Sequence, residues 1–409
     1  MTDTGFRLPL SDRCSREDVN RLLGFLEDQG TFRFPTLSNG LFSAAAGESD
    51  DFHLTGYRNI WTRDNIHIAH AHAVWGETPK AVKAIKSLMA FYVKHSQRFI
   101  DVIEGKADPS DPMVRPHIRF NGDTLDELSE KWSHAQNDAL GGFLWLAGKL
   151  ANECHWNREE LELLDRLVQF LAKVQFWQDE DSGHWEETRK IAASSIGVVT
   201  AALDVWGSRY DSALKSKGQS ALQSILPAEC IQPERTQNRR YDSALLFLIY
   251  PYQLVTGPMA DQIVDDVTTH LLGEHGIRRY LGDSYWCADY KEKLSAEVRT
   301  SDFSDDLSGR DRLLKPGFEA QWCLFDPIIS IHFGLKFART GDQGDRSRQI
   351  QHVNRSLAQL TKPGSAFGGY RCPESYYCEQ GKYVPNDICP LLWTQANLKL
   401  ALTHLARSL

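Results

Sequence analysis

The sequence predicts an all-α protein in which about twelve helices form an (α/α)6 barrel, a toroid of six inner and six outer helices. Apolar residues recur with helical periodicity along almost the whole chain, whereas the alternation typical of strands is rare. No low-complexity linker interrupts the 409 residues, so we expect a single domain over residues 1–409. Polar and aromatic residues cluster at the start of every second predicted helix, which a mixed helical array would not explain.

The predicted helices follow from this periodicity and from capping signals at their starts. The segment Ser15-Arg16-Glu17-Asp18 resembles a capping box that precedes an apolar helix face. Thr78 and Pro79 predict an N-cap and a first helical residue, and Asn157 with Glu160 predicts another capped start. The expected helices cover residues 15–29, 61–75, 78–100, 131–153, 157–177, 192–210, 212–224, 241–252, 259–271, 320–340, 345–361 and 390–408.

Three long segments, residues 101–130, 273–319 and 362–389, are expected to lie between these helices. Non-helical segments of this length inside a compact domain usually serve function.

The clusters that accompany the even-numbered helices contain side chains unsuited to an ordinary amphipathic helix. They are Trp61-Thr-Arg63-Asp64, Trp132 to Asp138, Trp185-Glu186-Glu187, Tyr241-Asp242, Glu319 to Trp322, and the stretch from Pro373-Glu374 to Leu392-Trp393. If the even-numbered helices run parallel as the inner ring, their six N-termini meet at one mouth. We therefore expect a mouth lined by tryptophan, arginine and carboxylate side chains.

The net charge limits the partners that the protein can bind, and the cysteines indicate its cellular compartment. Lys plus Arg number 46 and Asp plus Glu number 54, so the formal net charge is −8. This balance excludes a bulk electrostatic hold on nucleic acid or on an anionic membrane. No apolar run reaches the ~18 residues of a membrane span, and the start lacks the layout of a signal peptide. Eight cysteines without a secretory signal indicate free thiols and a cytoplasmic location.

The expected mouth suits the chemistry of sugars. Tryptophan faces can stack on pyranose rings, and the adjacent Arg63 and Asp64 offer donors and acceptors for several hydroxyls of one ring. Cleavage of a glycosidic bond needs two carboxyl groups, one protonated and one ionised.

Glu186 and Glu374 are the candidate pair for this chemistry. Trp185 gives Glu186 an apolar wall and Glu187 adds a like charge, so we expect a raised pKa and the role of general acid. Glu374 comes from the far side of the ring, in a loop bordered by Gly, Tyr and Pro. For Glu187 itself, stabilisation of a helix N-terminus and a contact with substrate both stay open.

Taken together, the clusters resemble glycoside hydrolase family 15, the glucoamylase family, and its relatives the α and β subunits of phosphorylase kinase. The matching segments are Trp61-Thr-Arg63-Asp64 with W-x-R-D, Trp132-Ser-His-Ala-Gln136-Asn137-Asp138 with W-G-R-P-Q-x-D, Gly183-His-Trp185-Glu186-Glu187 with W-E-E, Arg279-Tyr280-Leu-Gly-Asp283-Ser-Tyr285 with R-Y-x-x-D-x-Y, and Pro373-Glu374-Ser-Tyr376 followed by Pro390-Leu-Leu-Trp393-Thr-Gln-Ala with E-x-Y and P-L-x-W-S/T-x-A. The kinase subunits share the last segment most closely, including Tyr383-Val-Pro-Asn386-Asp387. The five matches occur in the family's order.

The resemblance implies an (α/α)6 barrel and inverting hydrolysis of an α-glucosidic bond from the non-reducing end, with release of β-glucose. It implies that Glu186 is the general acid and that Glu374 is the general base that activates water. It also implies that Arg63 and Asp64 bind the terminal glucose, with help from Arg279 and Trp185, and that Trp132 stacks near the scissile bond. The further candidates for substrate binding are Trp61, Asp138, Glu187 and Trp322.

The chain departs from the family pattern in two ways. Ser133-His134-Ala135 stands where the family has G-R-P, so contacts beyond the first sugar are expected to differ. The length leaves no room for the β-sandwich or the starch-binding module found in some members. We therefore expect a short intracellular oligosaccharide or the ends of a glycogen-like store as substrate, with trehalose as a further option, and no cofactor.

The histidines and cysteines form no metal motif. His67, His70 and His72 share a predicted helix, but no glutamate completes a zinc motif there. The last three cysteines are not spaced as in a zinc ribbon. We therefore expect core or cleft histidines, buried thiols and no metal site.

Two classes of function stay open from the sequence. The first is the inverting α-glucosidase, beside which transferase or phosphorylase chemistry on the same barrel also stays open. The second is a carbohydrate-sensing or regulatory protein, as the likeness to kinase subunits allows. Because a sensor has no need of two opposed carboxyl groups, the presence of both glutamates favours chemistry.

Overall fold

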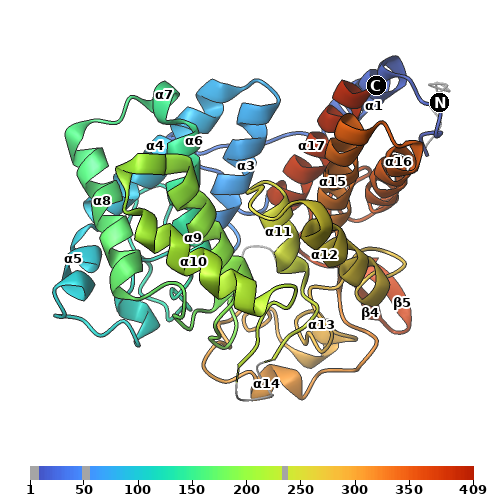
Figure 1. The fold of residues 1–409 in the computed structure, drawn as a ribbon. Coiled ribbons are helices and arrows are strands. Elements are labelled where there is room, and N and C mark those ends of the chain that lie inside the picture. The colour runs from blue at the N-terminus through green and yellow to red at the C-terminus, as the bar shows by residue number, and fades with distance from the viewer. Residues whose placement is uncertain (1–8, 48–55, 233–237) are drawn as a thin grey trace.

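The helices of the protein form two concentric rings in the computed structural model, which describes residues 9–47, 56–232 and 238–409 (Figure 1). The inner ring is made of α3 (Thr62–Val74), α6 (Asn137–Lys149), α9 (Ala193–Trp206), α11 (Leu246–Ile249), α15 (Phe325–Thr340) and α17 (Leu392–Ser408). Each of these helices contacts the next, and α17 contacts α3, so the ring is closed. This is the predicted (α/α)6 barrel, and all six inner helices are even-numbered in the predicted order.

Each inner helix is covered by an outer helix. The outer helices are α1 (Arg16–Asp28), α4 (Thr78–Lys94), α8 (Arg158–Lys173), α10 (Ser212–Ile225), α12 (Gly257–His270) and α16 (Gln343–Ala358). They contact α17, α3, α6, α9, α11 and α15, respectively. Chain neighbours therefore alternate between the two rings, as the alternation of sequence clusters predicts.

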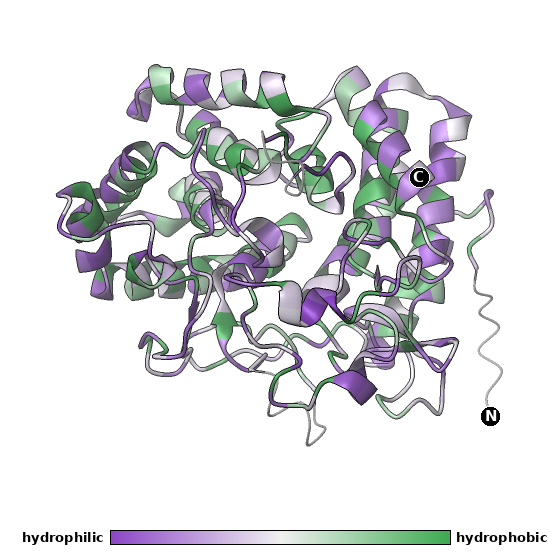
Figure 2. Cartoon of the chain, turned by 90° about the horizontal axis from the view of Figure 1, so that it is seen from below, coloured by the Kyte–Doolittle hydropathy of each residue, from purple (hydrophilic) through white to green (hydrophobic). Residues whose placement is uncertain are grey.

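Burial explains why the two rings have different sequences. In α8, the buried side chains include Leu163, Leu164, Leu167 and Leu171, which form one face of the helix. In α3, by contrast, 10 of 13 residues are buried, because this helix is enclosed on all sides. Figure 2 shows hydrophilic and hydrophobic residues alternating along the helices at the periphery of the molecule. The polar residues at the start of α3 are thus buried by the fold.

Short helices and strands occupy the connections between the barrel helices. The helices are α5 (Gln97–Ile103), α7 (Ala151–Cys154), α13 (Tyr290–Lys293) and α14 (Ser308–Asp311), with 3-10 turns at Pro112–Val114, Gly183–Trp185, Gly207–Arg209 and Ser243–Leu245. Strand β1 (Ile60–Trp61) pairs antiparallel with β2 (Arg119–Phe120). A second sheet has the order β3 (Gln321–Trp322), β4 (Ser375–Glu379) and β5 (Lys382–Pro385), with both pairs antiparallel. Strands of two to five residues are too short to show an alternating pattern.

All twelve predicted helices have a counterpart, but some predicted boundaries are wrong. The helix predicted at 131–153 begins only at Asn137, because Gln136 donates a hydrogen bond of 2.7 Å to the Ser133 carbonyl and holds the preceding residues in an irregular path. The helix predicted at 241–252 is reduced to a 3-10 turn and α11. It ends before Pro251, since the residue that precedes a proline is driven out of the helical region.

The predicted caps were right in two places and wrong in one. Capping boxes are present at Ser15 with Asp18 and at Asn157 with Glu160. The N-cap of α4 is Glu77, with Thr78 and Pro79 as its first helical residues, and no side chain caps it. The Glu77 carboxylate is bound instead by its neighbours, including Trp75 at 2.8 Å.

Two of the inner helices, α6 and α9, approach each other closely. A Cβ atom at Gly141 would lie 2.8 Å from Val199 Cγ2 and 3.0 Å from the Val199 backbone nitrogen. The glycine is therefore required for close helix packing.

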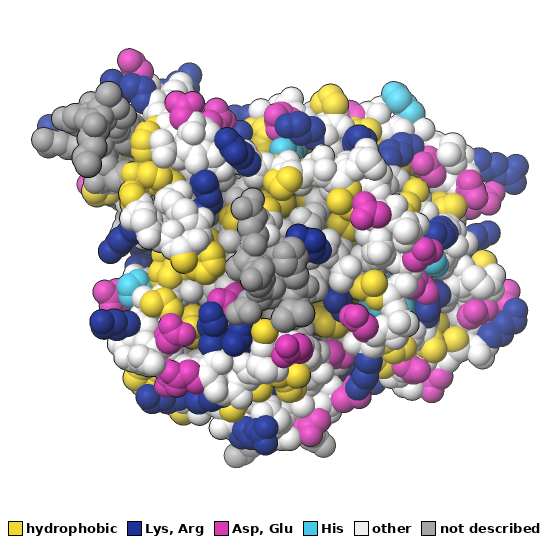
Figure 3. Space-filling model, turned by 180° about the vertical axis from the view of Figure 1, so that it is seen from behind, with side chains coloured by type: hydrophobic (Ala, Val, Ile, Leu, Met, Phe, Trp, Pro, Cys, Tyr) yellow, Lys and Arg dark blue, Asp and Glu magenta, His cyan; other side chains and the backbone are white. Residues whose placement is uncertain are grey.

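The surface carries intermixed charges. Figure 3 shows Lys and Arg side chains interspersed with Asp and Glu side chains over the rear face. Within the described ranges, no helix has the length and apolar character that a membrane crossing requires. All eight cysteines are free and buried, as predicted.

Candidate active site

A pit at the N-terminal ends of the inner helices brings together nine of the eleven candidate residues. It encloses about 110 Å³. The nine residues that line it are Trp61, Arg63, Asp64, Trp132, Trp185, Glu186, Arg279, Trp322 and Glu374. Asp138 and Glu187 lie behind its wall, since each is at most 2% exposed and each is paired with an arginine that lines the pit. The predicted convergence of distant clusters at one mouth is thus observed.

Glu186 lies on a turn between the 3-10 turn at Gly183–Trp185 and α9. Its φ of +56° is in the left-handed region, where residues other than glycine are uncommon and which is enriched at functional sites. Its Oε1 atom accepts hydrogen bonds from Trp61 Nε1 at 3.1 Å and Gln136 Nε2 at 3.2 Å, and lies 3.6 Å from Arg63 Nη1. Burial raises the pKa of Glu186 in spite of these partners. Within the described ranges every hydrogen bond to this carboxyl reaches Oε1, which leaves Oε2 to carry a proton.

Glu374 immediately precedes β4 and is 2% exposed. Tyr57 donates a hydrogen bond of 2.7 Å to its Oε1 atom, and Asn386 Nδ2 donates one of 2.6 Å to its Oε2 atom. Burial raises the pKa of Glu374 to about 7, although both hydrogen bonds act in the opposite direction. Two donors, one on each oxygen, suit the ionised form of a carboxyl group.

The two glutamates are linked by a pair of aromatic side chains. The rings of Tyr57 and Trp61 lie 5.3 Å apart, centroid to centroid, and each ring carries the donor that binds one of the glutamates. Glu186 and Glu374 therefore line the same pit, and the side chains that bind them lie next to each other. Glu186 has an open oxygen, whereas Glu374 accepts on both oxygens.

Arg63 and Asp64 come from the first turn of α3. Arg63 Nε donates a hydrogen bond of 2.6 Å to Asp138 Oδ2, and its Nη2 atom donates to Gln136 and, at 3.1 Å, to the Gly183 carbonyl. Burial would raise the pKa of Asp138, but the Arg63 guanidinium lowers it. Asp138 thus positions Arg63 from behind the pit. Burial raises the pKa of Asp64 to about 7.

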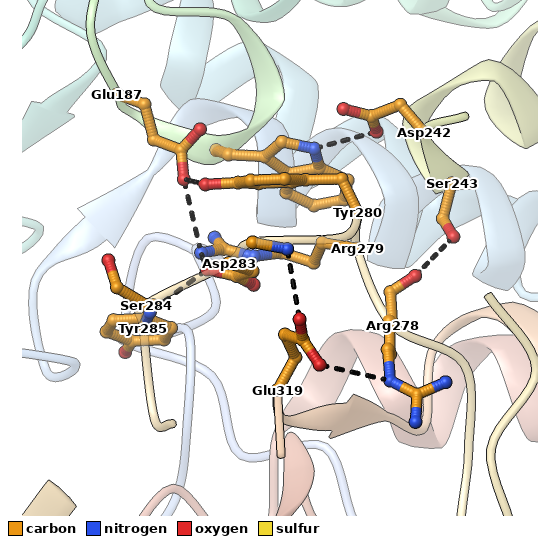
Figure 4. A network of polar contacts seen from close by, with 12 residues as sticks. Glu187, Asp242, Ser243, Arg278, Arg279, Tyr280, Asp283, Ser284, Tyr285 and Glu319 are labelled. Carbon is orange, nitrogen blue, oxygen red and sulfur yellow. Dashed lines mark hydrogen bonds and ion pairs between the residues drawn. The ribbon is translucent and has the colours of Figure 1, made fainter. Parts of the chain in front are cut away.

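A buried ion network holds Arg279 on the opposite wall (Figure 4). Arg279 makes two hydrogen bonds of 2.6 Å with the carboxylate of Asp283, and its Nη2 atom lies 3.4 Å from Glu187 Oε1. Its guanidinium lies 5.2 Å from the ring centroid of Trp185 and 5.0 Å from that of Trp322. These contacts hold the Arg279 guanidinium and the two tryptophan rings in fixed positions on this wall.

Glu187 belongs to this network. It accepts hydrogen bonds from Tyr280, Arg239 and Arg310 as well as from Arg279. Burial would raise the pKa of Glu187, but the three guanidinium groups outweigh burial and lower it to about 2. The expectation that Glu187 raises the pKa of Glu186 by repulsion was wrong in its cause, since burial is the main reason for that shift and the charge of Glu187 is balanced.

The start of α11 supports the pit indirectly. Asp242 accepts a hydrogen bond of 2.9 Å from Trp185 Nε1, whereas Tyr241 stacks on His270 outside the pit. Trp132 packs edge-on against Trp61, with ring centroids 6.0 Å apart. Residues that line the pit therefore lie at or near the N-termini of five inner helices. The residue Asp242 before the sixth, α11, holds Trp185 in position.

Sequence reasoning missed the residues that orient the two glutamates. Tyr57 lies in the irregular segment before α3, where no pattern marked it. Gln136 and Asn386 lie inside the quoted motifs, but motif similarity gave them no role. Asp302 and Arg310 also line the pit, and they come from the long segment 273–319 that was expected to be functional.

The histidines near the barrel axis pack against aromatic rings. His67 stacks on Trp393 with a centroid distance of 4.3 Å, and His184 stacks on Phe247 at 5.0 Å. Burial lowers the pKa of His184 to about 4. In the part of the chain that the structure describes, no group of three His, Cys, Asp or Glu side chains could hold a metal ion.

Comparison with known proteins gives a family model and several relatives. A model of the family described as Glycosyl hydrolases family 15 matches residues 30–358. The "Probable phosphorylase b kinase regulatory subunit alpha" of Caenorhabditis elegans is 26% identical over 266 residues, which is 56% of this chain and 21% of that protein. The chain thus spans about a fifth of the length of this relative.

Solved structures with similar folds are glycosidases and glucoamylases. A wild-type glycosidase superimposes with a TM-score of 0.68 at 15% identity and covers 96% of this chain and 99% of its own. The glucoamylase from Saccharomycopsis fibuligera superimposes with a TM-score of 0.60 at 12% identity, with 96% of both chains covered. At these identities the likeness shows the barrel fold.

Proposed function

The chain belongs to glycosyl hydrolase family 15, and on that premise we propose that it is an inverting, exo-acting α-glucosidase that releases β-glucose from a short oligosaccharide or a glycogen-like chain. The observation that carries the proposal is the pair of carboxyl groups in one pit. Glu186 has one oxygen free of hydrogen-bond donors among the described residues, and Glu374 accepts a hydrogen bond on each oxygen. A carboxyl group with a free oxygen suits a proton donor, and one that accepts on both oxygens suits a proton acceptor.

In this mechanism Glu186 gives a proton to the oxygen of the scissile bond while that bond breaks. Glu374 takes a proton from a water molecule, whose oxygen forms the new bond to the anomeric carbon from the opposite face. The leaving sugar departs as an alcohol, and the glucose product has the inverted configuration. Solvent then returns a proton to Glu186 and removes one from Glu374.

The hydrogen bonds of the two glutamates support these roles. Trp61 and Gln136 hold the Glu186 carboxyl by Oε1, so that the protonated oxygen keeps one orientation. Burial raises the pKa of Glu186, which favours a proton on it before reaction. Tyr57 and Asn386 bind Glu374 as donors, which favours its ionised form against the burial that raises its pKa to about 7, and which orients it toward water.

The other pit residues suit a single glucose ring as the terminal unit. Arg63 is held by Asp138, and its neighbour Asp64 lines the pit beside it, so the two offer donors and acceptors in fixed positions. Arg279 and Trp185 form a charged and apolar wall that fits the hydroxyls and the face of a sugar. The substrate is therefore proposed to enter by its non-reducing end. The free thiols fit a cytoplasmic location, which is part of the proposal.

The proposal is tested by incubation of the purified protein with maltose, maltotriose, isomaltose and trehalose, followed by assay of released glucose. Turnover of at least one substrate is expected, and the order of rates gives the linkage preference. Measurable binding without turnover of any substrate would replace the proposal with the carbohydrate-sensing alternative, which the similarity to a kinase regulatory subunit keeps in view.

A further inference from the structure

One wall of the pit is built by a segment that the proposed mechanism leaves without a role. Residues 286–320 connect Tyr285 to β3 and contain α13 and α14, which lie in the loop region below the helices in Figure 1. Of this segment, Thr300, Ser301, Asp302 and Arg310 line the pit. The segment therefore meets whatever ligand the pit holds.

Contacts on several sides fix this segment. Tyr290 donates a hydrogen bond of 2.9 Å to the Arg299 carbonyl, and Arg299 Nη1 donates one of 3.3 Å to Asp387. Arg310 Nε donates a hydrogen bond of 3.0 Å to Ser284 Oγ in the Arg279 network. At the outer edge, Asp305 pairs with Lys131, next to Trp132, but both side chains are more than half exposed, so this pair adds little to the rigidity of the wall. The wall thus has a defined shape on both sides of Asp302.

Asp302 has one oxygen with a partner and one without. Its Oδ1 atom accepts a hydrogen bond of 2.8 Å from the Ser304 backbone nitrogen. Its Oδ2 atom is buried, and no residue of the described ranges binds it. A buried carboxyl oxygen without a donor is costly, and a ligand hydroxyl in the pit would supply that donor.

Asp302 lies on the acid side of the pit. Its segment reaches that side through Asp305, whose ion-pair partner Lys131 directly precedes Trp132. Trp132 packs against Trp61, which donates a hydrogen bond to Glu186. Burial is the main reason for the raised pKa of Glu186, and the charge of Asp302 acts on Glu186 in the same direction. The acid of a glycosidase protonates the oxygen that joins the two sugars, so groups beside it meet the leaving sugar.

We propose that Asp302 recognises the leaving group, because its Oδ2 atom accepts a hydrogen bond from a hydroxyl of the sugar that departs. This inference rests on the proposed function and adds to it a preference for leaving groups that are themselves sugars. Asp302 is a specificity residue, and the bond-breaking steps need only the two glutamates.

The test separates binding from chemistry by use of the full-length Glu186→Gln protein, in which the acid is absent. Isothermal titration gives its affinity for glucose and for maltose, isomaltose and trehalose. The preference is the affinity for the tightest-bound disaccharide divided by the affinity for glucose. The variant Asp302→Asn, made in this background, keeps an oxygen for the Ser304 backbone and exchanges the open acceptor for a donor. The matched control is Asp305→Asn, three residues away in the same segment, at a carboxyl that is 62% exposed and does not line the pit.

We expect Asp302→Asn to lower the disaccharide preference at least tenfold, with glucose affinity within twofold, and Asp305→Asn to leave the preference unchanged. An unchanged preference in Asp302→Asn would overturn the inference and leave the proposed function standing if the native protein turns over its substrate. A lowered preference in a protein without any native turnover would support Asp302 as a sugar contact and overturn the hydrolase. Binding of neither glucose nor a disaccharide would overturn both.

Discussion

The hydroxyl group of Tyr57 lies 2.7 Å from Oε1 of Glu374 and donates a hydrogen bond to it. This bond stabilises the ionised carboxyl group against the effect of burial, which raises the pKa of Glu374 to about 7. If Glu374 is the general base, activity falls as the pH drops through this value and the carboxylate becomes protonated. On the proposed mechanism, the Tyr57 hydroxyl therefore extends activity to lower pH.

Tyr57→Phe should move the acidic limb of kcat/KM to higher pH by about 1–2 units, since a hydrogen bond to a charged group is worth about 1.5–3 kcal/mol and one pKa unit about 1.4 kcal/mol. Loss of the donor disfavours the ionised form, so the pKa rises and the base is protonated over a wider range. The measurement is the pH profile of kcat/KM. Tyr250→Phe is the control, because it removes a buried hydroxyl that bonds to histidines away from the pit. A limb that stays in place in Tyr57→Phe would mean that Glu374 is not the base.

Glu186→Gln and Glu374→Gln should each lower turnover by at least ~10²-fold with little effect on folding. In Glu186→Gln, the amide oxygen of the new side chain can still accept the two hydrogen bonds that reach Oε1 in the native protein. In Glu374→Gln, the Asn386 amide can rotate so that its Oδ1 atom, which has no partner among the described residues, accepts from the new amide. Steady-state kinetics and thermal unfolding measure both effects.

The control for these two variants is Glu379→Gln at the far end of β4, where the carboxyl accepts from Tyr377 outside the pit. It should retain native turnover. Near-native activity in either pit variant would show that another carboxyl group performs that role.

Glu187→Gln should lower the free energy of unfolding by about 3–5 kcal/mol at pH 7, because it leaves two buried guanidinium groups and a partly buried one with less negative charge. The pKa of Glu187 is lowered to about 2, so its contribution is complete above the ordinary value of 4.5 and is lost as the pH falls from there toward 2. Urea unfolding at pH 7 and pH 3 should therefore show a smaller difference between variant and native protein at the lower pH.

Asp165→Asn is the matched control for that loss. Asp165 pairs with Arg209 at 2.8 Å, with 45% of the Asp165 side chain exposed, and such a pair contributes less than about 1 kcal/mol. Equal losses in Glu187→Gln and Asp165→Asn would contradict the account of the buried network.

Gly141→Ala should destabilise the barrel by about 1–3 kcal/mol, because the new methyl group would meet the Val199 backbone nitrogen at 3.0 Å, and backbone cannot move aside as a side chain can. Gly24→Ala in α1 has no atom within 4 Å of its new Cβ and should stabilise the protein by about 0.5–1 kcal/mol. Chemical unfolding of both variants tests the packing of α6 on α9. A neutral Gly141→Ala would mean that these two helices pack less closely than observed.

The barrel could be predicted because the helical periodicity and the placement of the polar clusters both indicated it. Periodicity located the helices, and the alternating clusters separated inner from outer helices before any contact was known. The starts of α6 and α15 could not be predicted, since Gln136 binds the distant Glu186 as well as the nearby Ser133 carbonyl, and the strand at Gln321–Trp322 pairs with β4, which lies far away in the chain. Local propensity carries no information about such partners.

Most candidate site residues could be predicted from the sequence. The sequence did not show which of them line the pit and which hold other side chains in place. Tryptophans, arginines and the two glutamates stood out as unusual residues at helix starts. The fact that Asp138 and Glu187 hold arginines from behind depends on burial and side-chain direction, which adjacent sequence letters do not reveal. Tyr57 and Asp302 lie in irregular segments, where side-chain positions follow from the fold as a whole.

The stereochemistry of hydrolysis tests the central claim most directly. Proton NMR of the anomeric signals during the first minutes of reaction distinguishes α-glucose from β-glucose before the two forms equilibrate. With Glu186 as acid and Glu374 as the base for water, the first new signal is that of β-glucose. Initial release of α-glucose would show that one carboxyl group attacks the sugar directly, and it would contradict the roles assigned to both glutamates.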